Sequence, residues 1–357
     1  MNSVLPNEAS DRRGRFRAAT SALERFTDGD MVRMLAASEA LGSGIGGVRC
    51  LAEVAGVQVF VKQVPLTDRE LTTRGFRSTA NLFDLPMACH YGIASPGFGT
   101  WREVAANEMA TSAIAEGKSE AFPMLYHWRI FEEPLDSSDL DAIVEEVAEL
   151  WQGSHEVRSR LDAVATAPAT VLLFFEFLPT ALLDWLDRQV ELGVDTTNAA
   201  LEMVEAGLLE IADDLRSAGL LHFDAHFGNM RTDGRRVFLT DFGLASSPQF
   251  QLTSSERQFI ADNATHDRCH MLTRLVDWIV SSFIDGADWQ KRDMRIRMAH
   301  ERNGIGLERL SAKAASAVAR HAPIAMIIND FYRRLRFDER HARYPTDAIL
   351  RALEARE

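Results

Sequence analysis

Hydrophobic and polar residues alternate with a period of two early in the chain. The clearest example is VQVFVKQV, residues 57–64, and the strand-like pattern extends over residues 31–64. A Gly-rich turn at 42–47 and a second turn at 55–56 interrupt it. Period-two segments separated by short glycine-containing turns are typical of antiparallel hairpins. The pattern therefore predicts a small antiparallel sheet.

Further along, the pattern changes from strands to helices. We expect a helix over 101–117, a strand over 122–131, a buried strand over 171–179 that Pro179 ends, and a helix over 199–219. The acidic stretch 134–152 predicts a peripheral helix, and residues 65–99 predict irregular structure. A sheet-rich first part followed by a helical second part indicates the α+β class.

Composition and charge limit the class of protein. The chain has 357 residues, of which 46% are hydrophobic, and a net charge of −13. This charge argues against a nucleic-acid partner and weakly favours a cationic one. No apolar stretch is long enough to span a membrane. Three widely spaced cysteines imply no disulfide framework, so we expect a cytoplasmic protein.

Two carboxylates and an amide stand close together in the second part of the chain. In LHFDAHFGNM, Asp224 lies five residues before Asn229, and Asp241 follows a turn and a short strand at 236–240. Phosphoryl transfer needs oxygen ligands for Mg²⁺ and a carboxylate that accepts the proton of the attacking hydroxyl. Single Asp and Asn residues often only cap turns, but the joint pattern is much rarer.

The pattern His222-x-Asp224-x-x-x-x-Asn229, followed by Asp241-Phe242-Gly243, resembles the catalytic and metal-binding loops of the protein-kinase superfamily. The resemblance implies ATP and Mg²⁺ as cofactors. It also implies that Asp224 is the catalytic base and that Asn229 and Asp241 are the magnesium ligands.

The glycine-rich segment fits the same family. Gly42, Gly44 and Gly47 precede a strand, a turn and another strand, and not the helix that a dinucleotide fold requires. The resemblance implies that they cover the phosphates and that Lys62, in VFVK, contacts them. Period two places Lys62 on one face with Phe60, which would narrow the adenine pocket.

The lysine should pair with a glutamate of the following helix. Glu103 and Glu108 are the candidates, and we choose Glu103. The strand at 171–179 resembles the segment that links the two lobes of a kinase. There Glu176 and Leu178 would offer backbone groups to adenine, although a plain buried strand would look the same.

The resemblance implies a two-lobed fold with a small antiparallel-sheet N-lobe and a larger helical C-lobe. We expect an N-terminal arm over 1–30, an N-lobe with insertions over 31–175, and a C-lobe over 176–357. The acceptor region would lie among the C-lobe helices.

The acceptor is best sought among small molecules with a hydroxyl group. Phe223 stands where protein kinases usually have arginine, and His226 where they have lysine. His-x-Asp-x-His-x-x-Asn instead resembles the aminoglycoside and related phosphotransferases, so His226 joins the catalytic residues. One alternative is a serine/threonine protein kinase. Another is a catalytically inactive pseudokinase scaffold, and the intact Lys62 and Asp241 argue against this second alternative.

Overall fold

The first half of the chain is organised around a five-stranded antiparallel sheet. The computed structural model describes residues 8–44, 46–135, 145, 147–151, 153–285, 288–301 and 307–355. The strands lie in the order β1-β2-β3-β5-β4 and are β1 (Glu39–Gly44), β2 (Gly47–Val54), β3 (Val57–Leu66), β4 (Leu125–Phe131) and β5 (Ala169–Glu176). Every residue of β5 is buried. The small antiparallel sheet and the buried strand predicted near 171–179 are confirmed.

Two tight hairpins join the first three strands. Ala55 and Gly56, between β2 and β3, have φ angles of 52° and 76°, which matches the right-handed twist of the flanking strands. In the β1–β2 hairpin, Gly44 pairs with Gly47, whose φ is 112°. A Cβ atom at Gly47 would lie 1.9 Å from the carbonyl oxygen of Gln63. This glycine therefore permits the close approach of β2 to β3.

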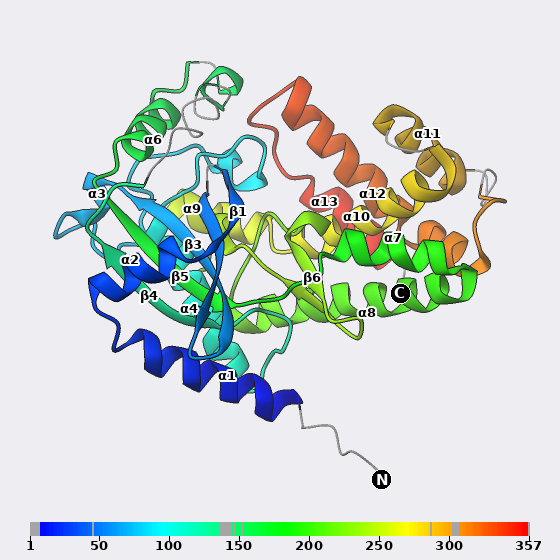
Figure 1. Cartoon of the computed structure of the whole chain (residues 1–357). Coiled ribbons are helices and arrows are strands. Elements are labelled where there is room, and N and C mark those ends of the chain that lie inside the picture. The colour runs from blue at the N-terminus through cyan, green and yellow to red at the C-terminus, as the bar shows by residue number, and fades with distance from the viewer. Residues whose placement is uncertain are drawn as a thin grey trace, which may run out of the picture.

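The N-terminal segment is helical, which corrects the expectation of an arm. Helix α1 (Glu8–Leu23) runs beside β4 at the edge of the sheet (Figure 1). The ring of Phe16 packs edge-on against Tyr126, with centroids 5.8 Å apart. The Thr20 hydroxyl donates a hydrogen bond of 2.8 Å to the carbonyl of Tyr126. This helix is thus docked on the sheet.

The strand-like pattern from residue 31 is also corrected at its start. Residues Asp28–Ala36 form helix α2, which begins after Thr27. The Thr27 hydroxyl accepts a hydrogen bond from the backbone N–H of Asp30, whose carboxylate accepts one from the N–H of Thr27. This reciprocal cap favours a helix. Its buried residues, Met31 and Met34, are three apart, which is helical spacing.

Further helical elements of the described residues lie between the strands in sequence. They are α3 (Asp68–Leu71), the 3-10 turn η1 (Met87–Tyr91), α4 (Thr100–Ala115) and α6 (His155–Ala165). Helix α4 confirms the prediction for 101–117. The helix predicted over 134–152 falls largely outside the described residues, because 136–144, 146 and 152 are not among them.

The second half of the chain is mainly helical and lies to one side of the sheet (Figure 1). Its helices are α7 (Leu182–Leu192), α8 (Val194–Ala218), α9 (Ser254–Asp262), α10 (His266–Val280), the π-helical turn η4 (Ser281–Asp285), α11 (Trp289–Glu301), α12 (Ala312–Phe337) and α13 (Thr346–Glu354). Helix α10 is almost entirely buried and packs against α12. None of the described helices combines the length and apolar character that crossing a membrane requires.

An irregular segment between α8 and α9 lies between the sheet and the helices. It contains η2 (Phe227–Asn229), β6 (Met230–Thr232), β7 (Val237–Leu239) and η3 (Phe242–Leu244). Its two ends are joined by reciprocal backbone hydrogen bonds of 2.9 and 2.8 Å between Leu221 and Ser246. Leu239 also donates to the carbonyl of Ala121 beside the sheet. Both predicted chemical loops are therefore anchored to the two halves of the molecule.

Candidate functional site

Three charged residues from distant segments meet beneath the sheet. Lys62 of β3 places its Nζ 2.6 Å from Oε1 of Glu103 on α4 and 2.8 Å from Oδ1 of Asp241. Lys62 is only 5% exposed and Glu103 only 4%. Glu108, the other candidate partner, instead pairs with Arg77 and accepts a hydrogen bond from Trp128. The predicted pair of Lys62 and Glu103 is present.

The charges of this group act strongly on one another. Burial acts to lower the pKa of Lys62, but the nearby Asp241 and Glu103 carboxylates outweigh it and raise that pKa. Burial acts to raise the pKa of Asp241, and the Lys62 ammonium overcomes this and lowers it to about 2. Burial raises the pKa of Glu103. Asp241 keeps 41% of its side chain exposed, so its charge faces the cleft.

The glycine-rich hairpin lies over this lysine. A Cβ atom added to Gly46 would be 3.3 Å from Nζ of Lys62. Of the three predicted glycines, Gly42 and Gly44 belong to β1 and Gly47 begins β2, and Gly42 has a φ of 103°. The hairpin therefore brings backbone without side chains close to the lysine, where an anion could approach the amide groups.

The segment that carries Asp224 is clamped from below by α10. The carboxylate of Asp267 accepts hydrogen bonds from the backbone N–H groups of His222, at 2.6 Å, and Phe223, at 2.8 Å. Phe223 has a φ of 64°, a conformation that costs energy for a side chain of its size. The His222 ring donates from Nε2 to the carbonyl of Thr240, and its Nδ1 accepts from the N–H of Asp224. These contacts position Asp224.

Asn229 locks the same loop from the other side. Its Nδ2 donates to the backbone oxygen and to Oδ2 of Asp224, both at 3.0 Å. The N–H and hydroxyl of Thr240, next to Asp241, both donate to the carbonyl of Asn229 at 2.8 Å. Asp224, Asn229 and Asp241 are thus tied together by short contacts, as the sequence predicts.

The oxygen atoms left over suit a hard metal ion. Asp241 has a φ of 64° and begins η3, and its Oδ1 accepts from Lys62 and from the N–H of Gly243. Because the Asn229 amide nitrogen is used for Asp224, its Oδ1 can serve as a ligand together with Asp241. Among the described residues, no group of three or more His, Cys, Asp and Glu side chains could hold a metal ion.

Asp224 is suited to accept a proton. Burial raises its pKa, while His226 and His222 oppose the shift. The Nε2 atom of His226 lies 3.7 Å from Oδ1 of Asp224, and the ring is part-exposed. A carboxylate with a raised pKa is a better general base than an ordinary one. His226 therefore lies close enough to Asp224 to influence its pKa.

A cavity of about 290 Å³ extends from the charged group under β1 and β3. Its apolar lining includes Leu41, Phe60, Phe175 and Leu178. The rings of Phe60 and Phe175 lie 6.3 Å apart, so Phe60 does face the cavity that its position predicts. These flat apolar groups can accommodate a planar base.

Glu176 contributes to this cavity less freely than expected. Its backbone N–H donates to the carbonyl of Met124 at 2.9 Å, so it cannot also bind a base. Its carboxylate is held by Arg12 of α1, with Nε to Oε1 and Oε2 distances of 2.9 and 2.8 Å. Leu178 lines the cavity directly. The backbone oxygen of Glu176 and Leu178 remain as the groups that could face adenine.

A second cavity, of about 260 Å³, reveals a wall that sequence analysis missed. It is shared by Lys62, Asp224 and Asp241 and is closed by the segment 92–100. A Cβ atom at Gly92, where φ is 71°, would lie 2.5 Å from Oδ1 of Asp224. The glycines clustered in this otherwise unassigned segment were the available signal, because close backbone approach requires glycine.

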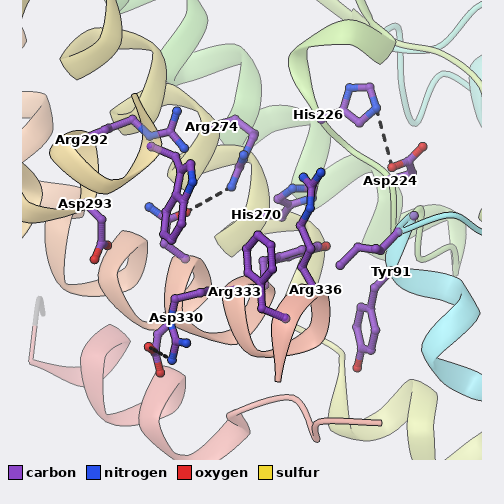
Figure 2. Close-up of a pocket in the computed structure, with 16 residues that line it drawn as sticks. Tyr91, Asp224, His226, His270, Arg274, Arg292, Asp293, Asp330, Arg333 and Arg336 are labelled. Carbon is purple, nitrogen blue, oxygen red and sulfur yellow. Dashed lines mark hydrogen bonds and ion pairs between the residues drawn. The ribbon is translucent and has the colours of Figure 1, made fainter. Parts of the chain in front are cut away.

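A third cavity, of about 560 Å³, opens on the far side of Asp224. Asp224 and Gly92 border both this cavity and the second one. Figure 2 shows Asp224 and His226 at one side and side chains of α10, α11 and α12 across from them. Sequence analysis placed the acceptor region among these helices without naming a residue.

No model of a protein family matches the chain, and no curated protein sequence matches it either.

Proposed function

We propose that this protein is an ATP- and Mg²⁺-dependent phosphotransferase that moves the γ-phosphate to a hydroxyl group of a small molecule. The observation that carries the proposal is the joint arrangement of two groups. Lys62 lies between Glu103 and Asp241, and Asp224 is held by Asn229 in the adjoining wall. Nucleotide, phosphate and acceptor would occupy the three neighbouring cavities in that order.

The fold supports the same proposal. A five-stranded antiparallel sheet precedes a helical region, with the glycine hairpin over the cavity and both chemical loops beneath it. This order agrees with the two-lobed protein-kinase-like fold that we propose. The three cysteines are buried and none forms a disulfide within the described part of the chain, which agrees with the reducing cytoplasm that we propose as the place of action.

In the proposed reaction the chain acts by positioning and by charge. Lys62 binds phosphate oxygens, and Glu103 keeps the ammonium in place. Asp224 orients the acceptor hydroxyl and takes its proton as the hydroxyl oxygen attacks the γ-phosphorus, and ADP leaves as the bond between its terminal oxygen and that phosphorus breaks. Mg²⁺, held by Asp241 and Asn229, would neutralise charge on the phosphates.

Two observations favour a small acceptor over a protein. The third cavity has a volume of about 560 Å³. This volume lies within the range of small-molecule sites, which is roughly 300–1,000 Å³. After η3, only residues 245–253 precede α9, which leaves little chain for a docking segment like that of protein kinases.

The decisive experiment incubates the purified chain with Mg²⁺ and γ-labelled ATP, with and without a set of hydroxylated small molecules. Label on a small molecule, lost in Asp224→Asn while ATP binding persists, would support the proposal. Label only on serine or threonine would favour a protein kinase. ATP binding with neither phosphate transfer nor ATP hydrolysis would favour the pseudokinase.

A further inference from the structure

The cavity beyond Asp224 carries an unusual concentration of arginine for a chain with a net charge of −13. Four arginines line it, from α10, α11 and α12: Arg274, Arg292, Arg333 and Arg336. In Figure 2 the Arg274, Arg292 and Arg336 side chains reach toward the middle of the cavity. We call these three residues the arginine group. If the proposed function is correct, they face the acceptor.

Two members of the arginine group share one carboxylate. Asp277, buried on α10, has its oxygens 3.1 Å from Arg274 and 3.2 Å from Arg292. Asp277 also accepts a hydrogen bond of 2.9 Å from Asn329. The buried Nε of Arg274 has no hydrogen-bond partner among the described residues. Two guanidinium groups against one carboxylate leave a net positive charge beside the cavity.

The third member has no carboxylate of its own. Within the described part of the chain, Arg336 forms no ion pair, and the Cζ atom of its guanidinium lies 5.6 Å from the centroid of the Phe337 ring. Arg333, in contrast, is matched by Asp330 at 3.1 Å and Asp338 at 2.6 Å and adds no positive charge. Positive charge therefore concentrates at the arginine group.

The acidic residues of the cavity do not cancel that charge. Asp330 is taken up by Arg333, and Asp293 pairs with Arg297 on the same helix at 2.9 Å. The other oxygen of Asp293, Oδ1, has no hydrogen-bond partner among the described residues. Asp224 remains on the opposite side as the proposed base.

Aromatic rings complete the cavity. Trp289 and Phe337 stack with centroids 5.9 Å apart at an angle of 19°, and both are largely exposed in it. Tyr332 stacks on His270 at 5.0 Å. Flat apolar surfaces beside hydrogen-bonding groups are typical of sites for ring-shaped polar molecules.

We propose that the acceptor is an anionic, hydroxyl-bearing small molecule whose carboxylate or phosphate binds the arginine group while a hydroxyl faces Asp224. Guanidinium groups bind both anions through paired hydrogen bonds. The side chains thus favour an anion over the cationic acceptor that the overall charge of the chain favours.

Binding of a matched set of pyranoses tests this proposal. Glucuronate, glucose 6-phosphate, glucose and glucosamine differ mainly in charge and are titrated into the ATP-free protein by calorimetry. We expect at least one anion to bind more tightly than glucose, and glucosamine most weakly. Arg336→Gln should weaken binding of the anion about tenfold, as expected for loss of a charge-assisted hydrogen bond, and leave glucose unaffected.

Arg334→Gln is the matched control, because Arg334 lies on the same helix and pairs with Glu339 outside the cavity. Arg292→Gln repeats the test from α11. The inference would be overturned if all four sugars bound equally well or if neither anion bound. It would also be overturned if neither Arg336→Gln nor Arg292→Gln weakened binding of the anion.

ATP binding, measured in the same samples, separates the two proposals. Anion binding that depends on Arg336 in a protein that does not bind ATP would overturn the proposed function and leave the anion site standing. ATP binding by a protein that shows no preference for anions would overturn the anion site and leave the proposed function standing.

Discussion

The two ends of the cleft carry opposite excesses of charge. Around Lys62, two carboxylates surround one ammonium. Around Asp277, two guanidinium groups share one carboxylate, and Arg336 adds a third cation. The first arrangement suits a divalent cation with bound phosphates, and the second suits an anionic acceptor. The comparison teaches that net charge over the whole chain is a poor guide to the charge of either site.

The two ends also differ in construction. The end around Lys62, where we propose that the nucleotide binds, is formed by β3, α4 and the loops around η2 and η3. Its contacts are short and buried. The end around Asp277, where we propose that the acceptor binds, is lined by long side chains of three helices. Several of these side chains are exposed. We expect the first to tolerate no substitution and the second to tolerate changes that alter selectivity.

The largest effect should follow from neutralising the carboxylate end with Asp241→Asn. The change removes the charge of one of the two carboxylates paired with Lys62, and of a proposed metal ligand, while preserving the shape of the side chain. Turnover should fall about 1,000-fold or more, as when a charge that stabilises phosphoryl transfer is lost. Steady-state kinetics over a Mg²⁺ titration measures this. Asp213→Asn, an exposed residue on α8 paired with Arg216, should leave turnover unchanged; a loss below tenfold in Asp241→Asn would contradict the assignment.

Gly92 lies at the boundary between the two ends, and its role can be tested by adding one methyl group to it. Gly92→Ala should displace Asp224, since the new Cβ would lie 2.5 Å from its Oδ1, and reduce turnover about 100-fold. Gly97→Ala has the same φ of 71° and no atom within 4 Å of its Cβ. It imposes the same backbone strain without the clash. Equal activity of the two variants, measured at equal Tm, would show that Gly92 does not position the base.

The partner of Lys62 is tested by two glutamates of one helix. Glu103→Gln keeps a hydrogen bond but removes a charge from Lys62, and we expect kcat/KM for ATP to fall on the order of tenfold to a hundredfold. Glu108→Gln should change it little, because Glu108 pairs with Arg77 outside the cleft. A larger loss in Glu108→Gln would reverse the assignment.

The smallest effect concerns pH. Activity requires deprotonated Asp224, so kcat/KM should fall as pH drops through its pKa, which burial raises above 3.8. The other nearby groups are His222 and Asn229, which lower that pKa, and Asp241, which raises it. Because His226 also lowers it, His226→Gln should move the acid limb upward, by less than about one unit. A downward shift, or the same shift in the exposed control His155→Gln, would contradict this.

Several elements could be predicted because their signals are local. The turn at Ala55–Gly56, the helix α4 and the apolar strand β5 all follow from a few neighbouring residues. Helix α2 could have been found from its capping pair, Thr27 and Asp30, which outweighed the strand-like pattern. Helix α1 has mixed charges along its length, and its contacts with β4 stabilise it.

By itself, the sequence determined which residues are candidates for the proposed nucleotide site. Lys62, Asp224, Asn229 and Asp241 lie in short motifs that resemble those of the protein-kinase superfamily, so their proposed roles could be expected before the fold was known. Only the tertiary structure decided the character of the acceptor end. There the positive charge that Arg274, Arg292 and Arg336 leave uncompensated depends on which side chains the packing of α10, α11 and α12 brings together, and no local pattern specifies that packing.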